Sequence, residues 1–157
     1  MTAYDNSSLY NTSSIDTTVN ELLALNSSDV IEYSRITPNT NSTQDSNVTI
    51  YNLGNTMIDL NLYGYGEAQG DNLAMKCDIG NITIEKQKFN LTSANSDYSY
   101  SMSSLANLSN AQTFTGFNLA KAKSTAGSSA IIYWKIGIPK FIRGACNGTV
   151  VFGAVKS

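Results

Sequence analysis

The stretch NVTIYNLGNTMIDLNLYGYG, Asn47 to Gly66, decides the fold class. In its first half, Val48 and Ile50 lie two residues apart, between polar or aromatic neighbours, and a Gly-Asn pair ends the run. In its second half, Leu60 and Leu62 repeat the same spacing. Successive side chains of a strand point to opposite faces, so this period of two indicates half-buried strands. We therefore predict two strands joined by a turn.

The same period recurs along the chain, while sustained helical periodicity does not. Further strands are predicted at Thr17–Leu25, Asp29–Ile36, Asn81–Phe89, Ala130–Pro139 and Thr149–Val155, and the region 92–123 is read as strand, loop and strand. The residues of Thr17–Leu25 also favour a helix on propensity, but its neighbours are strands. Short strands without intervening helices are typical of two antiparallel sheets packed face to face. We predict an all-β sandwich of about eight strands.

The expected core centres on the one tryptophan. Ile132, Trp134 and Ile136 share one face of a strand, Lys135 belongs to the opposite face, and Phe152 lies on the inward side of the last strand. Buried tryptophans cover a large apolar area, so we expect Trp134 at the centre of the core. The alternative is that Trp134 stacks on a sugar, but its apolar partners favour the core.

The chain is rich in acceptor triplets for N-linked sugars, of the form Asn-x-Ser/Thr. With 18 asparagines and 35 serines and threonines in 157 residues, chance alone would give roughly four. Nine are present: Asn6, Asn11, Asn26, Asn41, Asn47, Asn81, Asn90, Asn107 and Asn147. We expect covalent N-glycans on several of them; the alternative is simply a polar β-protein surface.

The two cysteines, Cys77 and Cys146, stand 69 residues apart. They could form a disulfide in an oxidising compartment, or remain two buried thiols. The acceptor triplets point to an exported protein, which favours the disulfide. Residues 1–8 lack the basic and apolar segments of a secretory signal. Export would therefore require a processed form, and in the cytosol the triplets would carry no sugar.

Composition argues against several functions. The net charge of −2, with scattered lysines, provides no basic surface for nucleic acid, and no apolar run is long enough to span a membrane. The chain has no histidine, which excludes the usual catalytic triads and zinc hydrolases. Glu67 and Asp71, in the glycine-rich stretch Gly64–Asn72, suggest calcium only weakly, since no EF-hand spacing is present. We predict no catalytic residue, no metal and no cofactor.

The first residues are expected to form an extension. Residues 1–16 contain too few apolar side chains to fold alone, so we divide the chain into an N-terminal arm, 1–16, and a domain, 17–157. An extended arm can add a strand to the sheet of a neighbouring subunit, and head-to-tail repetition of that contact makes a fibre.

Four stretches together resemble the immunoglobulin-like β-sandwich domains of archaeal cell-surface proteins, including filament subunits. They are Tyr33–Ser42, Val48–Gly66, Leu73–Phe89 and Ile132–Val155. The resemblance implies an immunoglobulin-like fold and a location at the cell surface. It supports fold and location better than any activity.

These observations lead to one expected function. The chain is predicted to be a non-enzymatic structural subunit of an extracellular filament or coat, binding copies of itself through strand edges. Two alternatives remain. One is a glycan-binding adhesion module that uses its tyrosines, among them the pairs Tyr63 and Tyr65 or Tyr98 and Tyr100, together with the Gly64–Asn72 loop. The other is a spacer domain of a longer surface protein.

Overall fold

The structure, a computed structural model, describes residues 2–4, 10–28, 30–93, 97–99, 103–104, 112–123 and 127–157. The described residues form thirteen strands and one short 3-10 turn, η1 (Ile84–Lys86). The strands are β1 (Thr2–Tyr4), β2 (Tyr10–Thr12), β3 (Leu25–Ser27), β4 (Ser46–Asn52), β5 (Ile58–Tyr65), β6 (Leu73–Ile79), β7 (Asn81–Thr83), β8 (Gln87–Asn90), β9 (Ser103–Ser104), β10 (Gln112–Leu119), β11 (Ser128–Ile136), β12 (Arg143–Asn147) and β13 (Thr149–Lys156). Within this part of the chain, no helix has the length and apolar character that crossing a bilayer requires.

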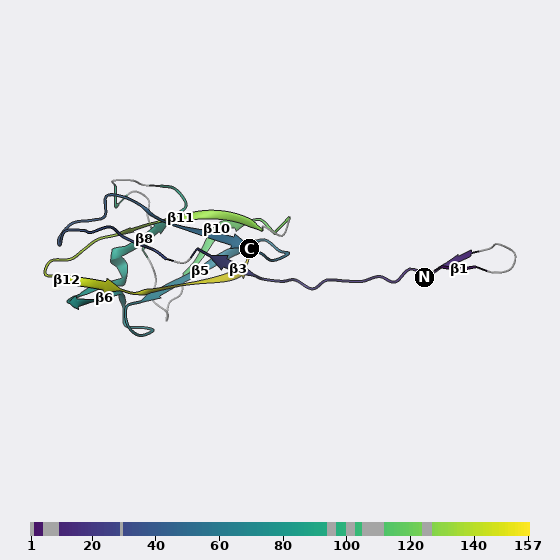
Figure 1. The fold of residues 1–157 in the computed structure, drawn as a ribbon, viewed down its shortest axis with the longest axis horizontal. Coiled ribbons are helices and arrows are strands. Elements are labelled where there is room, and N and C mark those ends of the chain that lie inside the picture. The colour runs from purple at the N-terminus through teal and green to yellow at the C-terminus, as the bar shows by residue number, and fades with distance from the viewer. Residues whose placement is uncertain are drawn as a thin grey trace.

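The body of the protein contains three sheets, and every strand pair is antiparallel (Figure 1). One has the order β3-β4-β11-β8-β9, the second β10-β5-β13 and the third β12-β6-β7, while β1 and β2 form a separate ribbon. The prediction of an all-β chain with antiparallel sheets is confirmed. Seven strands are five or more residues long, and the remaining six are shorter.

The second and third sheets are successive parts of one long ribbon. Tyr65 of β5 pairs with Thr149 of β13, and Lys76 of β6 pairs with Asn147 of β12, so the chain from β5 to β6 runs beside the chain from β12 to β13. Gly148 stands at the junction of β12 and β13. A side chain there would collide with the backbone carbonyl of Ala74, so only glycine permits this close approach.

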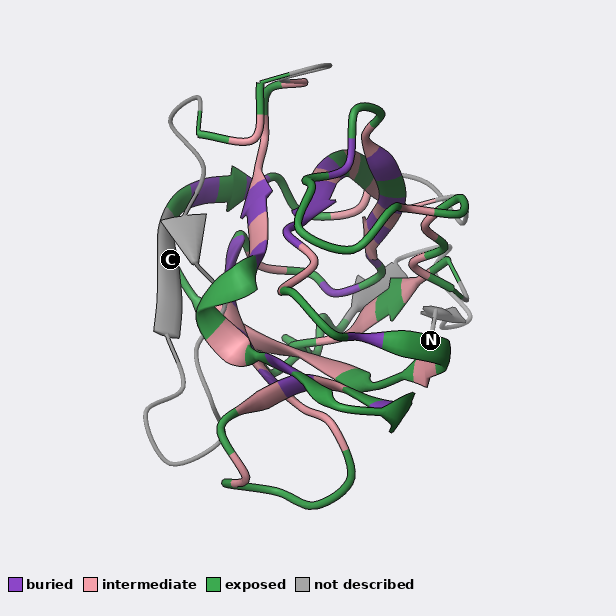
Figure 2. Ribbon diagram, turned by 90° about the vertical axis from the view of Figure 1, so that its left-hand side faces the viewer, coloured by how far each residue is buried: buried purple, intermediate pink, exposed green. Residues whose placement is uncertain are grey.

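The main core lies between the five-stranded sheet and the sheet β10-β5-β13. Trp134 is completely buried, with the Phe89 ring centroid 5.4 Å away and Phe152 packed edge-on at 6.0 Å. Ile132 and Ile136 are buried as well, while Phe152 is half-buried and packs against the core. Buried residues alternate with less buried ones along β4, and Figure 2 shows buried residues in bands along the ribbon. A second core cluster, below the segment 30–38, contains Ala74, Cys77, Ile82, Ile136 and Ile142.

Two polar residues that alternation assigns to outward faces are buried. Lys135 has no exposed surface, because the loop before β4 lies over that face of β11 and brings Asp45 and Thr43 to its side chain. Asp59 is 6% exposed and accepts a hydrogen bond from the Asn118 backbone at the end of β10. Alternation predicts which face a side chain belongs to, but loops that cover the far face are invisible to it.

The predictions for the region before β4 are largely wrong. Of Thr17–Leu25 only Leu25 belongs to a strand, β3, and residues 30–36 form no strand. This part of the chain is held to the turn after β4 by backbone hydrogen bonds from Leu53 and Asn55 and by the side chain of Asn55. Asn55 accepts a hydrogen bond from the Leu22 backbone at 2.7 Å and donates one to the Asn20 carbonyl at 2.9 Å. The N-terminal segment runs away from the sheets (Figure 1), and the domain boundary at residues 16 and 17 stays a prediction.

Candidate functional site

A groove runs between the segment 27–38 and the sheets below it. It contains one cavity of about 260 Å³, lined among others by Val48 of β4, Ala74 of β6 and Val150 of β13. A second and larger cavity of about 930 Å³ lies further along the same segment, over β6 and β12. We call these two cavities together the 27–38 groove.

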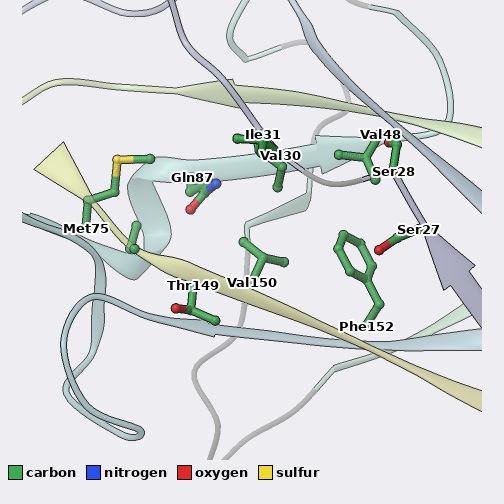
Figure 3. A pocket seen from close by; sticks show the side chains of 12 residues that line it. Ser27, Ser28, Val30, Ile31, Val48, Met75, Gln87, Thr149, Val150 and Phe152 are labelled. Atoms are coloured by element: carbon green, nitrogen blue, oxygen red, sulfur yellow. The ribbon is translucent and has the colours of Figure 1, made fainter.

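The smaller cavity of the 27–38 groove has a mixed lining, in which aliphatic and aromatic side chains stand beside Ser27, Ser28, Gln87 and Thr149. Ile31, Val150 and Phe152 face it, and Gln87 points into it from β8 (Figure 3). Gln87 is only 2% exposed; its Nε2 donates to the Tyr33 hydroxyl at 3.2 Å, but its Oε1 has no hydrogen-bond partner among the described residues. A buried acceptor without a partner costs roughly 1–3 kcal/mol. A backbone N–H entering the cavity would remove that cost.

The larger cavity has an apolar floor and an irregular roof. Ile82, Ile136 and Ile142 form part of the floor and are buried in the second core cluster. The roof is the segment 30–38, in which the Tyr33 hydroxyl accepts the hydrogen bond from Gln87. Burial raises the pKa of this hydroxyl well above the ordinary value. Residues 30–36 belong to no strand, so this side of the groove presents backbone groups that no sheet pairs.

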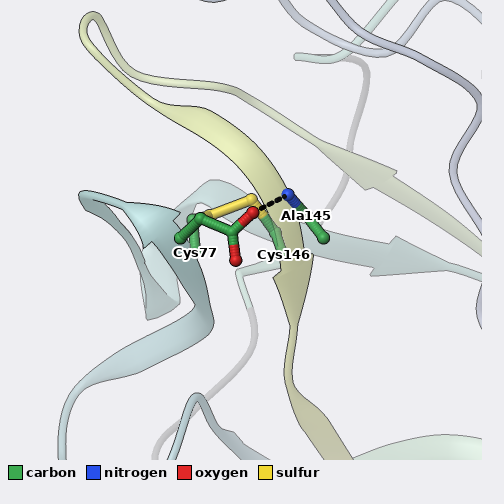
Figure 4. The surroundings of a disulfide bond; sticks show 4 residues. Cys77, Ala145 and Cys146 are labelled. Carbon is green, nitrogen blue, oxygen red and sulfur yellow. Dashed lines mark hydrogen bonds between the residues drawn. A yellow bond between two sulfur atoms is a disulfide. The ribbon is translucent and has the colours of Figure 1, made fainter.

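The two cysteines lie beside the larger cavity. Cys77 and Cys146 are cross-strand partners in β6 and β12 and form a disulfide (Figure 4). Next to the bond, Asp78 accepts a hydrogen bond from the Ala145 backbone at 2.9 Å. Gly144 has a φ of 83°, and a side chain there would collide with Asp78. The structure thus shows the disulfide and not two free thiols. The bond joins β6 and β12, which form a wall of the 27–38 groove.

The arm exposes apolar side chains to water. Ile15 and Val19 are 86% and 85% exposed, and in an extended chain these two residues lie on the same face. Leu22 and Leu23 are about half exposed where the arm meets the body. The arm leaves the body at the end where β3 lies, whereas β6 and β12, which line the larger cavity, lie at the opposite end (Figure 1).

The acceptor asparagines lie mostly on the surface. Five are exposed: Asn26, Asn41, Asn47, Asn81 and Asn147. Asn90 is half-buried, and its side chain accepts a hydrogen bond from the Leu91 backbone. Asn11 falls in β2, and Asn6 and Asn107 lie outside the described residues. Glycosylation therefore stays a prediction, with at least five accessible positions.

The glycine-rich loop is organised by Asp71. The Asp71 carboxylate accepts hydrogen bonds from the backbone of Gly66, Glu67, Ala68 and Leu73. Partial burial raises the pKa of this carboxyl, but the four N–H donors outweigh it and lower the pKa to about 2. Among the described residues, no cluster of acidic or cysteine side chains suited to a metal ion occurs.

Of the four paired tyrosines named for the adhesion alternative, the structure describes three. Tyr63 and Tyr65 of β5 share a face, as predicted, and both are half-buried. Tyr98 is also half-buried; its hydroxyl donates to the Lys86 carbonyl at 2.8 Å, and the Lys88 ammonium lies 4.4 Å from its ring centre. Tyr100 lies outside the described residues.

Sequence reasoning missed the 27–38 groove because it assigned Asp29–Ile36 to a strand. Gln87 was not singled out either, and its position after the short 3-10 turn offers no signal by itself. Comparison with known protein families, with curated proteins and with solved structures gives no match for this chain.

Proposed function

We propose that this protein is a structural subunit that assembles into an extracellular filament or coat by placing its N-terminal arm in the 27–38 groove of the next copy. One observation carries the proposal: the N-terminal segment exposes two large apolar side chains, Ile15 and Val19, and the 27–38 groove combines apolar floor residues with a buried acceptor, the Oε1 of Gln87, that has no partner among the described residues. Each feature supplies what the other lacks.

The arm has the chemistry of a donor strand. Ile15 and Val19, on one face, would enter the groove, and burying each would contribute roughly 1.5–3 kcal/mol. The polar residues between them would remain at the surface. The extended backbone would pair with unpaired groups along the segment 30–36 and along the free edge of β13, adding main-chain hydrogen bonds.

The positions of arm and groove favour an open polymer. The arm leaves one end of the body and the larger cavity lies at the other (Figure 1). A contact between two different surfaces repeats head to tail, and it forms a filament when the rotation between copies does not close a ring. An arm that reaches its own groove would have to fold back along the body.

The proposed location rests on the disulfide and on the surface asparagines. Disulfides persist in oxidising compartments, and the Cys77–Cys146 bond is formed here. Sugars on the five exposed acceptor asparagines would cover sheet edges and limit unwanted pairing. The immunoglobulin-like identity of the fold belongs to the same proposal; antiparallel sheets packed about a central tryptophan support it.

Charge placed on the face of the arm that would enter the groove provides the test. The double variant Ile15→Asp, Val19→Asp should remain monomeric, because each carboxylate would have to leave water to enter the groove. Thr18→Asp is the matched control, since residue 18 lies on the opposite face of the extended arm. It should still polymerise. Pelleting and negative-stain electron microscopy of the purified chains provide the readout.

Two results would contradict the proposal. If the double variant formed the same filaments as the unaltered protein, the arm would not be the donor segment. If the unaltered chain stayed monomeric at all concentrations and was retained on a saccharide array, the adhesion alternative would replace the filament.

A further inference from the structure

A second site lies on the other side of the five-stranded sheet, away from the 27–38 groove and the disulfide. Lys135, on the central strand β11, has a side chain with no exposed surface, and its Nζ stands 3.2 Å from Oδ1 of Asp45. The Asp45 side chain is itself only 6% exposed. The Lys135 Nζ also donates to the Thr43 carbonyl at 3.3 Å, and the Ser93 hydroxyl donates to Oδ2 of Asp45.

A lysine and an aspartate in this position form an unusual ion pair. Removing two charges from water is expensive, and their attraction repays the cost only when the geometry and the remaining hydrogen bonds are good. In a dry site, proton transfer from the ammonium to the carboxylate yields a neutral amine and a neutral acid without moving either group. The neutral amine is then a nucleophile, and the Oδ1 that lies 3.2 Å from it is bonded to the electrophilic Cγ of Asp45.

We propose that Lys135 and Asp45 condense to form an intramolecular amide bond between β11 and the loop before β4. After the proton has moved from Nζ to Oδ1, the neutral Nζ attacks Cγ of Asp45 and a negative charge develops on Oδ2. A second Nζ proton passes to Oδ1, the Cγ–Oδ1 bond breaks, and one water molecule leaves. Oδ2 becomes the amide carbonyl oxygen, and Nζ retains one hydrogen. The step consumes no oxidant or co-reactant.

The surrounding groups suit each stage of this step. Because the Ser93 hydroxyl donates to Oδ2, it stabilises the charge of the tetrahedral intermediate and then remains bonded to the amide oxygen. The Thr43 carbonyl, which faces Nζ, can accept the one hydrogen left on the amide nitrogen. Fixed proximity replaces the encounter of two groups in solution and so lowers the barrier to such a condensation. The product also removes two buried charges.

The proposed bond would tie together parts of the chain that are distant in sequence. Lys135 belongs to the strand that pairs with both β4 and β8 and so forms the middle of the largest sheet. A covalent link from this strand to the loop before β4 would resist separation of the two strands when the protein is pulled from its ends. The inference does not depend on the assembly proposed above, since it concerns a single chain.

Intact mass provides the test. The full chain, purified folded from a host that adds no N-glycans and measured after reduction, is expected to be lighter than its sequence by one water molecule. Trypsin should then release a branched peptide in which residues 36–76 are joined to residues 124–140, because the modified Lys135 is no longer cleaved. A folded protein at the full sequence mass, without the branched peptide, would overturn the proposal.

Two variants identify the reacting groups. Lys135→Met removes the nucleophile and should restore the full mass, whereas Asp45→Asn keeps an electrophilic carbon and should lose one ammonia instead of water. A water loss that persists in Lys135→Met would place the lost water at another residue, and the proposal would fail. If Lys135→Met does not fold, the presence or absence of the branched peptide in the unaltered protein decides the question.

Discussion

Removing the disulfide should destabilise the protein strongly, and the size of the effect follows from the spacing of its cysteines. The bond closes a loop with a sequence separation of 69 residues. In the chain-entropy treatment, a cross-link over that length lowers the entropy of the unfolded chain enough to stabilise the fold by about 4 kcal/mol at 25 °C. For a chain of this size, that corresponds to a melting temperature about 10 °C lower without the bond. Because Cys77 and Cys146 are paired across β6 and β12, reduction should weaken the wall of the 27–38 groove first.

Urea unfolding followed by the fluorescence of Trp134 measures this difference. Oxidised protein, reduced protein and the double variant Cys77→Ala, Cys146→Ala should be compared, the reduced sample isolating the cross-link because both sulfur atoms remain. The same reductant should leave the double variant unchanged. A difference between oxidised and reduced protein below about 1 kcal/mol would show that the loop between the cysteines is already constrained in the unfolded chain, and the entropy argument would be wrong here.

Three further predictions concern single positions. Ile132→Ala should lower the free energy of unfolding by about 2–5 kcal/mol in the same urea assay, because Ile132 is fully buried and a cavity would remain; a loss below about 1 kcal/mol would mean that the site collapses. Gly144→Ala should melt at a lower temperature than Gly70→Ala, since both glycines have positive φ but only at 144 does a side chain meet Asp78; equal melting temperatures would contradict this. Asp71→Asn should be less stable than the unaltered protein above about pH 4, by under about 1 kcal/mol, because the carboxylate is only partly buried and solvent screens it. Because its folded pKa is lowered to about 2, this difference should vanish as the pH falls through about 2, and an NMR titration that gives an ordinary pKa would refute it.

The fold class could be predicted from the sequence where strands have one solvent-exposed and one buried face. Val48, Ile50, Leu60 and Leu62 alternate with polar neighbours, and all four are buried. The same argument placed Trp134 in the core. It assigned Lys135 to the outward face, but it could not predict that a loop 90 residues away in sequence buries that side chain.

The candidate site was less accessible to sequence reasoning. The exposed arm was expected from its composition, although the chain stays away from the sheets until about Asn20, beyond the boundary expected at residue 16. The 27–38 groove was not expected, because DVIEYSRI has the alternation of a strand. In the structure this segment has no partner strand, and strand pairing depends on the assembled sheet and not on the local pattern.

By itself, the sequence determined the all-β character, the inward faces of β4, β5 and β11 and the richness in acceptor asparagines, because these depend on local alternation and composition. The tertiary structure alone decided the rest: that Cys77 meets Cys146, that Lys135 meets Asp45, and that residues 30–36 remain unpaired over a groove. Each of these is a contact between segments far apart in the chain. Such contacts depend on how the sheets pack, which no local pattern contains.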